Sequence, residues 1–213
     1  MNLKIIYVYD ALCAWCYGFS PVMLAIYENF SHEFEFEVLS GGMILGARVN
    51  PAGEDPAINS GLYKLVEETS GITFGLPFLH NLEGGNMVFN SEIPAIALSV
   101  FKSIAPSKAV EFVHHIQNSI YFDGKNPADP ELYRYLAVNY SIDPDEFEIK
   151  MNDPLYKDDA HYDFALTRQL QVHSYPAVFV QQSESKFYMI ARGYADYETM
   201  ELRINNVKME IGY

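Results

Sequence analysis

Cysteine is scarce in this chain: Cys13 and Cys16 are the two among 213 residues. This number excludes a scaffold held together by several disulfides and a four-cysteine zinc site within one chain. Long hydrophobic runs are lacking too, because no stretch approaches the roughly 20 apolar residues that a membrane-spanning helix needs. The sequence therefore predicts a globular protein whose cysteines have a purpose other than stapling the fold.

Basic residues are also few: 14 Lys and Arg stand against 28 Asp and Glu, which gives a formal net charge of −14. An acidic surface repels nucleic-acid phosphates and anionic lipids, so we expect neither nucleic-acid nor membrane partners. The apolar run Ile5–Tyr9 ends at Asp10 and is shorter than the apolar stretch of about 7–15 residues in an export signal. We therefore expect a cytoplasmic protein.

The hydrophobic pattern predicts a βαβ unit at the start of the chain. Residues 3–9 are almost continuously apolar, as in a buried strand, and residues 13–30 repeat apolar side chains at helical spacing. Residues 33–39 alternate polar and apolar side chains, as in a half-buried strand. The two strands are expected to be parallel, with a right-handed crossover.

Helical patterns dominate the middle of the chain, and strand patterns return only near its end. Residues 177–181 and 187–191 predict a hairpin, and Asp196 is expected to cap a last helix to about residue 209. The predicted order is βαβ, a helical insertion and ββα, which is an α/β fold. The expected helices of the insertion cover residues 55–70, 92–104, 107–121, 130–140 and 154–172.

One stretch of the insertion is predicted to be a long loop. Residues 71–90 contain Gly75, Pro77, Gly84 and Gly85, which indicate a segment without a regular element. A loop of this length in a compact domain is usually functional or packed as a lid.

The two cysteines form the motif Cys13-Ala14-Trp15-Cys16, directly after the first strand and at the start of the first helix. Cys13 would face unpaired backbone N–H groups and the positive end of the helix dipole, which favour its thiolate. Cys16 would lie one turn inside the helix, where it can attack the Cys13 sulfur of a mixed disulfide. The motif predicts thiol–disulfide exchange.

Two other readings of the cysteines remain open. They could be inert buried thiols, or they could supply half of a zinc site completed by His114, His115 or His161. No paired histidine spacing typical of a zinc finger follows, and the strand-before, helix-after context favours redox chemistry over a metal site.

A second element lies far along the chain, where Ser174-Tyr175-Pro176 precedes the first late strand. Proline suits the first residue of a strand because it cannot donate to the ladder, and its peptide bond could be cis or trans. Beside it, His173 is either a thiolate-stabilising residue or an ordinary surface residue. Asp10 is either a buried proton acceptor for Cys16 or a cap of the turn.

The order of these elements resembles the thioredoxin fold, with Cys-x-x-Cys opening the first helix and X-Pro preceding the terminal ββα unit. Pro21 resembles the kinking proline of that family's active-site helix. The helical block resembles the DsbA-like branch, and Asp10–Tyr17 resembles the FrnE-like cytoplasmic dithiol–disulfide oxidoreductases. The resemblance implies a discontinuous thioredoxin-fold domain over 1–50 and 172–213, with a helical insertion over 51–171.

The resemblance also implies a catalytic role for three residues of this sequence. Cys13 would be the nucleophile, Cys16 the resolving thiol and Pro176 the cis-proline beside them.

Three neighbours of these residues would then bind the substrate. The backbone of Tyr175 would pair with an extended substrate chain, and Ala14 and Trp15 would lie beside it. Ala14 departs from the proline that is commoner in the family, and the two residues between the cysteines tune the stability of the thiolate.

We therefore expect a protein disulfide oxidoreductase or isomerase that acts on protein or small-molecule disulfides as a monomer or homodimer. It would need no bound cofactor and no metal, and glutathione or a thioredoxin system would be its electron partner. In the cytoplasm, reduction or isomerisation is favoured over oxidation.

Two alternatives stay open. One is a glutathione-dependent transferase or isomerase of small aromatic molecules on a DsbA-like scaffold, although such proteins usually have serine at the position of Cys13. The other is a binding module that uses the thiols for redox sensing.

Overall fold

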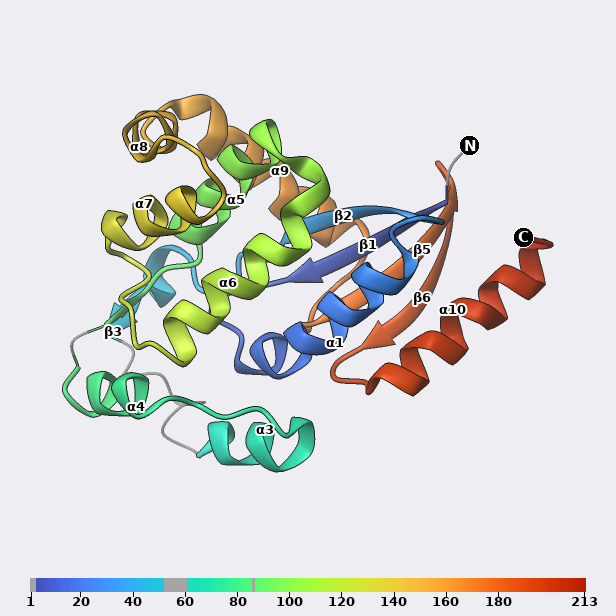
Figure 1. Cartoon of the computed structure of the whole chain (residues 1–213), viewed down its shortest axis with the longest axis horizontal. Helices are drawn as coiled ribbons and strands as arrows, with labels where there is room; N and C mark the ends of the chain where they lie inside the picture. The colour runs from blue at the N-terminus through green and yellow to red at the C-terminus, as the bar shows by residue number, and fades with distance from the viewer. Residues whose placement is uncertain (1–2, 52–60, 86) are drawn as a thin grey trace.

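A mixed four-stranded sheet with strand order β2-β1-β5-β6 forms the centre of the computed structural model, which describes residues 3–51, 61–85 and 87–213 (Figure 1). Strand β1 (Lys4–Tyr9) pairs in parallel with β2 (Glu35–Ser40) and antiparallel with β5 (Ala177–Ser183). Strand β6 (Lys186–Arg192) pairs antiparallel with β5. The predicted βαβ and ββα units therefore share one sheet, and the α/β thioredoxin fold is confirmed.

Strand β1 is apolar along its whole length because both of its faces are covered. Ile5, Tyr7 and Tyr9 belong to the main core, while Ile6 and Val8 belong to a second cluster on the opposite face. The main core includes side chains of α1 (Ala14–Phe30) and α10 (Tyr197–Ile211), and the end of α9 (Pro154–Gln169) packs on the second cluster. This layering explains the continuous apolar run.

Helices fill the chain between β2 and β5, and α5, α7, α8 and α9 gather into one block beside the sheet (Figure 1). Three of them begin at an Asp-Pro pair: the Asp129, Asp143 and Asp153 carboxylates accept backbone N–H bonds of the first turn. The helices before α9 are α3 (Leu62–Ser70), α4 (Leu76–Glu83), α5 (Glu92–Ile104), α6 (Ala109–Tyr121), α7 (Pro130–Asn139) and α8 (Pro144–Met151). Short elements are η1 (Gly46–Arg48), β3 (Asn50–Pro51), β4 (Val88–Phe89) and η3 (Pro106–Lys108).

The predicted loop over 71–90 is wrong, because α4 lies inside it and β4 follows. Gly75 is the N-cap of α4, Pro77 lies in its first turn, and Gly84 is its C-cap. These residues bound a short helix instead of preventing one, since a proline near a helix start needs no N–H partner. The prediction also missed α8, and the start of the predicted helix 55–70 lies outside the described residues.

A charged network fastens the helical block to the end of β2. The Lys102 ammonium on α5 donates to the two carboxylate oxygens of Asp163 on α9 at 3.1 and 2.9 Å, and to the Val38 carbonyl at 3.1 Å. Asp163 also accepts from the Ser40 N–H at 3.3 Å. Because β2 is an edge strand, the network supplies partners for backbone groups that the sheet leaves unpaired.

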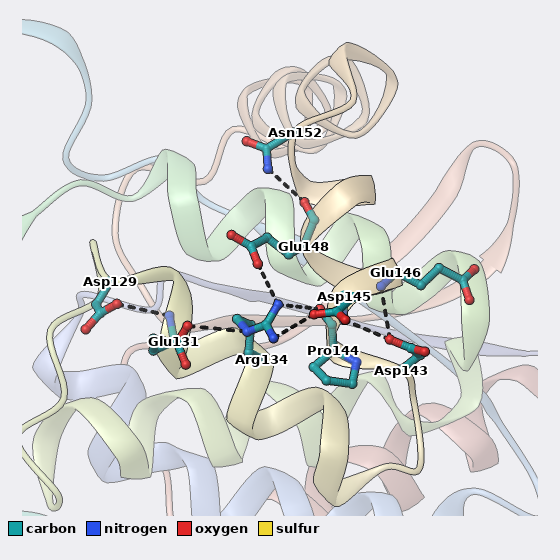
Figure 2. Close-up of polar contacts among 9 residues, drawn as sticks. All are labelled: Asp129, Glu131, Arg134, Asp143, Pro144, Asp145, Glu146, Glu148 and Asn152. Atoms are coloured by element: carbon teal, nitrogen blue, oxygen red, sulfur yellow. Dashed lines mark hydrogen bonds and ion pairs between the residues drawn. The ribbon is translucent and has the colours of Figure 1, made fainter.

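A second charged cluster joins α7 to α8 at the surface (Figure 2). The Arg134 guanidinium pairs with carboxylates of Glu131 at 3.3 Å, Asp145 at 2.7 Å and Glu148 at 2.6 Å. One arginine thus offsets part of the negative charge of three carboxylates and bridges the two helices. No helix within the described ranges combines the length and apolar character needed to cross a membrane.

Candidate active site

Cys13 is the N-cap of α1, at the point where β1 has ended and the chain has turned. The Cys16 N–H donates to the Cys13 sulfur at 3.3 Å. An N–H of the first helical turn donates in the same way to an anion bound at a helix N-terminus. Across the site, the Cys13 Sγ is 3.6 Å from the Tyr175 carbonyl oxygen, to which its S–H can donate. The sulfur therefore lies between the helix N-terminus and a loop 162 residues further along the chain.

The two thiols are free in this structure and chemically unequal. Cys13 is 6% exposed and borders a pocket, whereas Cys16 is 0% exposed. Burial, together with the neighbouring Cys13, raises the pKa of the Cys16 thiol well above its usual range. Cys16 therefore stays protonated near neutral pH.

The loop that faces Cys13 ends in a cis peptide bond between Tyr175 and Pro176, immediately before β5. The peptide geometry that the sequence left open is thus cis. The Tyr175 hydroxyl donates to the Gly41 carbonyl at 2.8 Å, and burial raises the pKa of Tyr175 to about 12. The Gly193 N–H donates to the Pro176 carbonyl at 2.8 Å, which ties the loop to the end of β6.

A pocket of about 500 Å³ opens beside Cys13. Ala14 and Trp15 of α1 line it together with Tyr175, so the three residues that the resemblance implied for substrate binding border one pocket with Cys13. Its remaining wall is formed by Leu12, Gly41, Gly42, Met43, Leu62, Tyr63, Phe74, Phe78, Tyr121, Val172 and Ser174, and its basic side chains are Arg48, Arg168 and His173.

Sequence reasoning missed part of this wall. Tyr63, Tyr121 and the two arginines come from segments that no motif connects, so only the folded chain brings them to the cysteines. Tyr63 of α3 and Tyr121 of α6 were recognisable as helix positions but not as pocket residues.

Asp10 anchors the turn before Cys13. Its buried carboxylate accepts from the N–H groups of Leu12 at 3.0 Å and Met43 at 2.7 Å, and from the Ser91 hydroxyl at 2.9 Å. Burial raises the pKa of Asp10, while these hydrogen bonds act in the opposite direction. Asp10 thereby links the site turn to the loop after β2 and to the start of α5.

The three histidines considered for a zinc site have partners of their own. His114 Nδ1 is 2.9 Å from the Ser20 hydroxyl, His115 Nδ1 is 2.8 Å from the Tyr140 hydroxyl, and His161 Nε2 is 2.7 Å from the Glu92 carboxylate. Among the residues that the structure describes, no three His, Cys, Asp or Glu side chains converge as metal ligands would. His173 is exposed at the rim of the pocket.

Solved structures with the same fold include several disulfide oxidoreductases. A candidate protein disulfide isomerase from Nitrosomonas europaea is 22% identical, with a TM-score of 0.85 over 99% of each chain. The cytosolic disulfide reductase DsbM from Pseudomonas aeruginosa is 19% identical, with a TM-score of 0.80 over 98% of this chain and 99% of its own. A second DsbM structure, with glutathione, is 18% identical, with a TM-score of 0.78 over 99% of this chain and 100% of that one.

Among curated protein sequences, none matches this chain significantly. The family model described as Thioredoxin matches residues 7–202, a span that contains both cysteines, the helical block and the cis-proline loop. The chain belongs to the thioredoxin family and has the fold of its DsbA-like disulfide oxidoreductases.

Proposed function

We propose that this chain is a thiol–disulfide oxidoreductase that uses Cys13 as the nucleophile and Cys16 as the resolving thiol. The observation that carries this proposal is the position of the Cys13 sulfur. It accepts an N–H bond from the first turn of α1, borders an open pocket and faces the Tyr175 carbonyl at 3.6 Å. The sulfur can accept a bond from the helix N-terminus, and the pocket lets a substrate reach it.

The reaction proceeds in two exchanges that conserve electrons. The Cys13 thiolate attacks one sulfur of a substrate disulfide, a mixed disulfide forms, and the other substrate sulfur leaves as a thiolate. Cys16 then loses its proton and attacks the Cys13 sulfur, which releases the second substrate thiolate. The substrate gains two electrons, and the protein is left with a Cys13–Cys16 disulfide.

The substrate would lie between α1 and the cis-proline loop. The Tyr175 backbone borders the pocket beside Cys13, where an extended peptide can pair with it before Pro176. Ala14 and Trp15 line the same pocket. Under this proposal residues 1–50 and 172–213 form the redox domain, and the insertion 51–171 supplies the remaining pocket wall.

We further propose that the protein works in the reducing direction or as an isomerase in the cytoplasm, with glutathione or a thioredoxin system as its electron partner. The DsbM fold supports this direction, since DsbM is a cytosolic disulfide reductase with a glutathione complex. Substrate thiols and disulfides are then the only reactants, and no bound cofactor or metal takes part.

The first test is the equilibrium redox potential of the Cys13/Cys16 pair, measured in glutathione buffers by alkylation and mass spectrometry. A reversible two-electron couple near the thioredoxin value of about −270 mV would support a reductase, and one near the DsbA value of about −120 mV would indicate an oxidant. A protein that forms no intramolecular disulfide at any poise would overturn the dithiol mechanism.

Trapping of the mixed disulfide distinguishes the roles of the two cysteines. Cys16→Ser should accumulate a mixed disulfide with substrate, whereas Cys13→Ser, the matched control, should not. If both variants trap equally, the assigned roles of Cys13 and Cys16 are wrong.

A glutathione-dependent transferase is the second candidate, favoured by the aromatic wall of Tyr63, Phe74, Phe78 and Tyr121 beside Cys13. Such an enzyme would form no Cys13–Cys16 disulfide during turnover. Cys16→Ser would then keep full turnover with a small aromatic electrophile, whereas the dithiol enzyme would lose multiple turnover.

A further inference from the structure

Two of the chain's five arginines line the Cys13 pocket, although the chain as a whole has a net charge of −14. Arg48 lies at the end of η1, and Arg168 lies in the last turn of α9. The two side chains therefore come from segments 120 residues apart in sequence and converge on one pocket. Both are exposed at its rim.

Two of the other three arginines have partners for their side chains. Arg134 binds three carboxylates (Figure 2), and Arg203 donates to the Ile190 carbonyl at 2.8 Å. Within the described residues, by contrast, the guanidinium groups of Arg48, Arg168 and Arg192 have no hydrogen bond or ion pair, and of these three only Arg48 and Arg168 line the Cys13 pocket. A guanidinium group matches the geometry of a carboxylate. In so acidic a chain, two guanidinium groups that line the Cys13 pocket and have no partner among the described residues form a binding feature for an anion.

We propose that Arg48 and Arg168 are specificity-determining residues that bind the carboxylates of a small anionic disulfide while Cys13 attacks it. This inference rests on the proposed function of Cys13. The pocket volume of about 500 Å³ suits a ligand of the size of a short peptide. The expected ligand is a peptide thiol, or its disulfide, with carboxylates on both sides of the sulfur. Glutathione is an example.

The exchange follows the two steps given above, with the anionic disulfide as oxidant and the Cys13/Cys16 dithiol as reductant. The first exchange releases one half of the substrate disulfide as a thiolate, and the second exchange releases the half that was bound to Cys13. Each thiolate then takes a proton from water. Net turnover needs a different dithiol reductant for the protein disulfide, such as a thioredoxin system, because reduction by the same low-molecular-weight thiol would only regenerate the anionic disulfide.

A single-turnover competition tests the inference without any added reductant. Reduced protein is mixed with glutathione disulfide, which is anionic, with bis(2-hydroxyethyl) disulfide, which is neutral, or with cystamine, which is cationic. Trp15 is the chain's only tryptophan and lies between the cysteines, so its fluorescence reports disulfide formation. The measured quantity is the ratio of the rate constant of each charged disulfide to that of the neutral one.

We expect R48Q/R168Q to lower the ratio for the anionic disulfide about tenfold and to raise the ratio for cystamine. High salt should reduce the wild-type ratio in the same direction, since screening weakens exposed charge pairs. R48K, which keeps the charge, should retain most of the selectivity. R192Q removes an exposed arginine outside this pocket and should leave both ratios at their wild-type values.

The failure of this inference is distinguishable from that of the proposed function. If wild type reacts with the neutral disulfide but R48Q/R168Q leaves both ratios unchanged, the arginines do not select the substrate and only this inference falls. If the wild-type protein reacts with none of the three disulfides, the proposed function falls with it. Equal unfolding midpoints in urea for all variants would show that the rim substitutions leave the fold intact.

Discussion

The phenol ring of Tyr175 lies directly against the α-carbon of Gly41. A Cβ at position 41 would come within 2.4 Å of two ring carbons of Tyr175, and the Tyr175 hydroxyl bonds to the Gly41 carbonyl. No residue other than glycine fits under this ring. Because the Tyr175 carbonyl faces Cys13, the residue at the end of β2 sets the position of the loop opposite the sulfur.

Gly41→Ala should therefore both destabilise the protein and slow the reaction of Cys13 with disulfides. A clash with this half-buried ring costs about 1–3 kcal/mol, as in other overpacked sites. Urea unfolding and single-turnover exchange measure the two effects. Tyr175→Phe is the control, because it keeps the ring and removes one hydrogen bond, at a cost of about 1 kcal/mol. An alanine variant with wild-type stability and rate would refute the steric argument.

The two cysteines should differ sharply in alkylation. Because burial raises the pKa of the Cys16 thiol, iodoacetamide near neutral pH should modify Cys13 and leave Cys16 untouched. Peptide mass spectrometry after timed quenching measures both sites. The same treatment in urea should modify both cysteines, which controls for intrinsic reactivity. Similar rates at both sites in the folded protein would contradict the structure.

The resolving step should accelerate as the pH rises. The thiolate fraction of Cys16 grows about tenfold per pH unit while the pH stays below its raised pKa. A preformed mixed disulfide on Cys13 should therefore release its small thiol faster at pH 8 than at pH 6. The rate of thiol release can be followed by stopped-flow absorbance. A flat profile over this interval would show that deprotonation of Cys16 does not limit resolution.

His114 should make the protein less stable in mild acid. Burial lowers the pKa of His114 below its usual value, so the unfolded chain takes up a proton before the folded protein does. The contribution of neutral His114 to the free energy of unfolding is fully present above the pKa of histidine in the unfolded chain, about 6.5. It declines as the pH falls through that value. His114→Gln should reduce the loss between pH 7.5 and pH 5.5 in urea unfolding. His32→Gln, at an exposed histidine, should keep the wild-type slope; equal slopes for all three proteins would reject the assignment.

Lys102→Met should be strongly destabilising, because it leaves the buried Asp163 carboxylate without its cation. The expected loss is about 3 kcal/mol, at the lower end for a broken buried pair because Lys102 is partly exposed. Lys102→Met/Asp163→Asn should recover part of that loss. Chemical denaturation of both variants and of Asp163→Asn completes the double-mutant cycle. A zero coupling energy would mean that the pair contributes only its packing.

The local parts of the fold were readable from the sequence. The apolar run of β1, the N-cap position of Cys13 and the cap of α10 by Asp196 follow from short-range rules, and each is present. The helix α4 was missed because Gly75 and Gly84, which cap it, were interpreted as breakers. The helix α8 was missed because it buries only Phe147, so its sequence has almost no apolar period.

The site was predictable only where a motif marks it. The Cys13–Cys16 spacing and the proline before a strand identify two halves of the site without their geometry. The basic rim has no such signal: Arg48 and Arg168 stand in unremarkable contexts and meet through the path of the helical block around the sheet. Long-range convergence of this kind depends on tertiary packing, which local patterns do not encode.

The polar network at the end of β2 has a consequence for protein engineering. A minimal redox protein made by excising residues 51–171 would lose Lys102 and Asp163, the partners of the Val38 carbonyl and the Ser40 N–H, and Ser91, a partner of the buried Asp10 carboxylate. The two remaining pieces would meet at a seam where the Val38 carbonyl and the Ser40 N–H lack these partners and the Asp10 carboxylate has lost one of its own. A trimmed version of this scaffold would first need new partners at that seam, so the helical block is an integral part of the redox protein, not a detachable accessory.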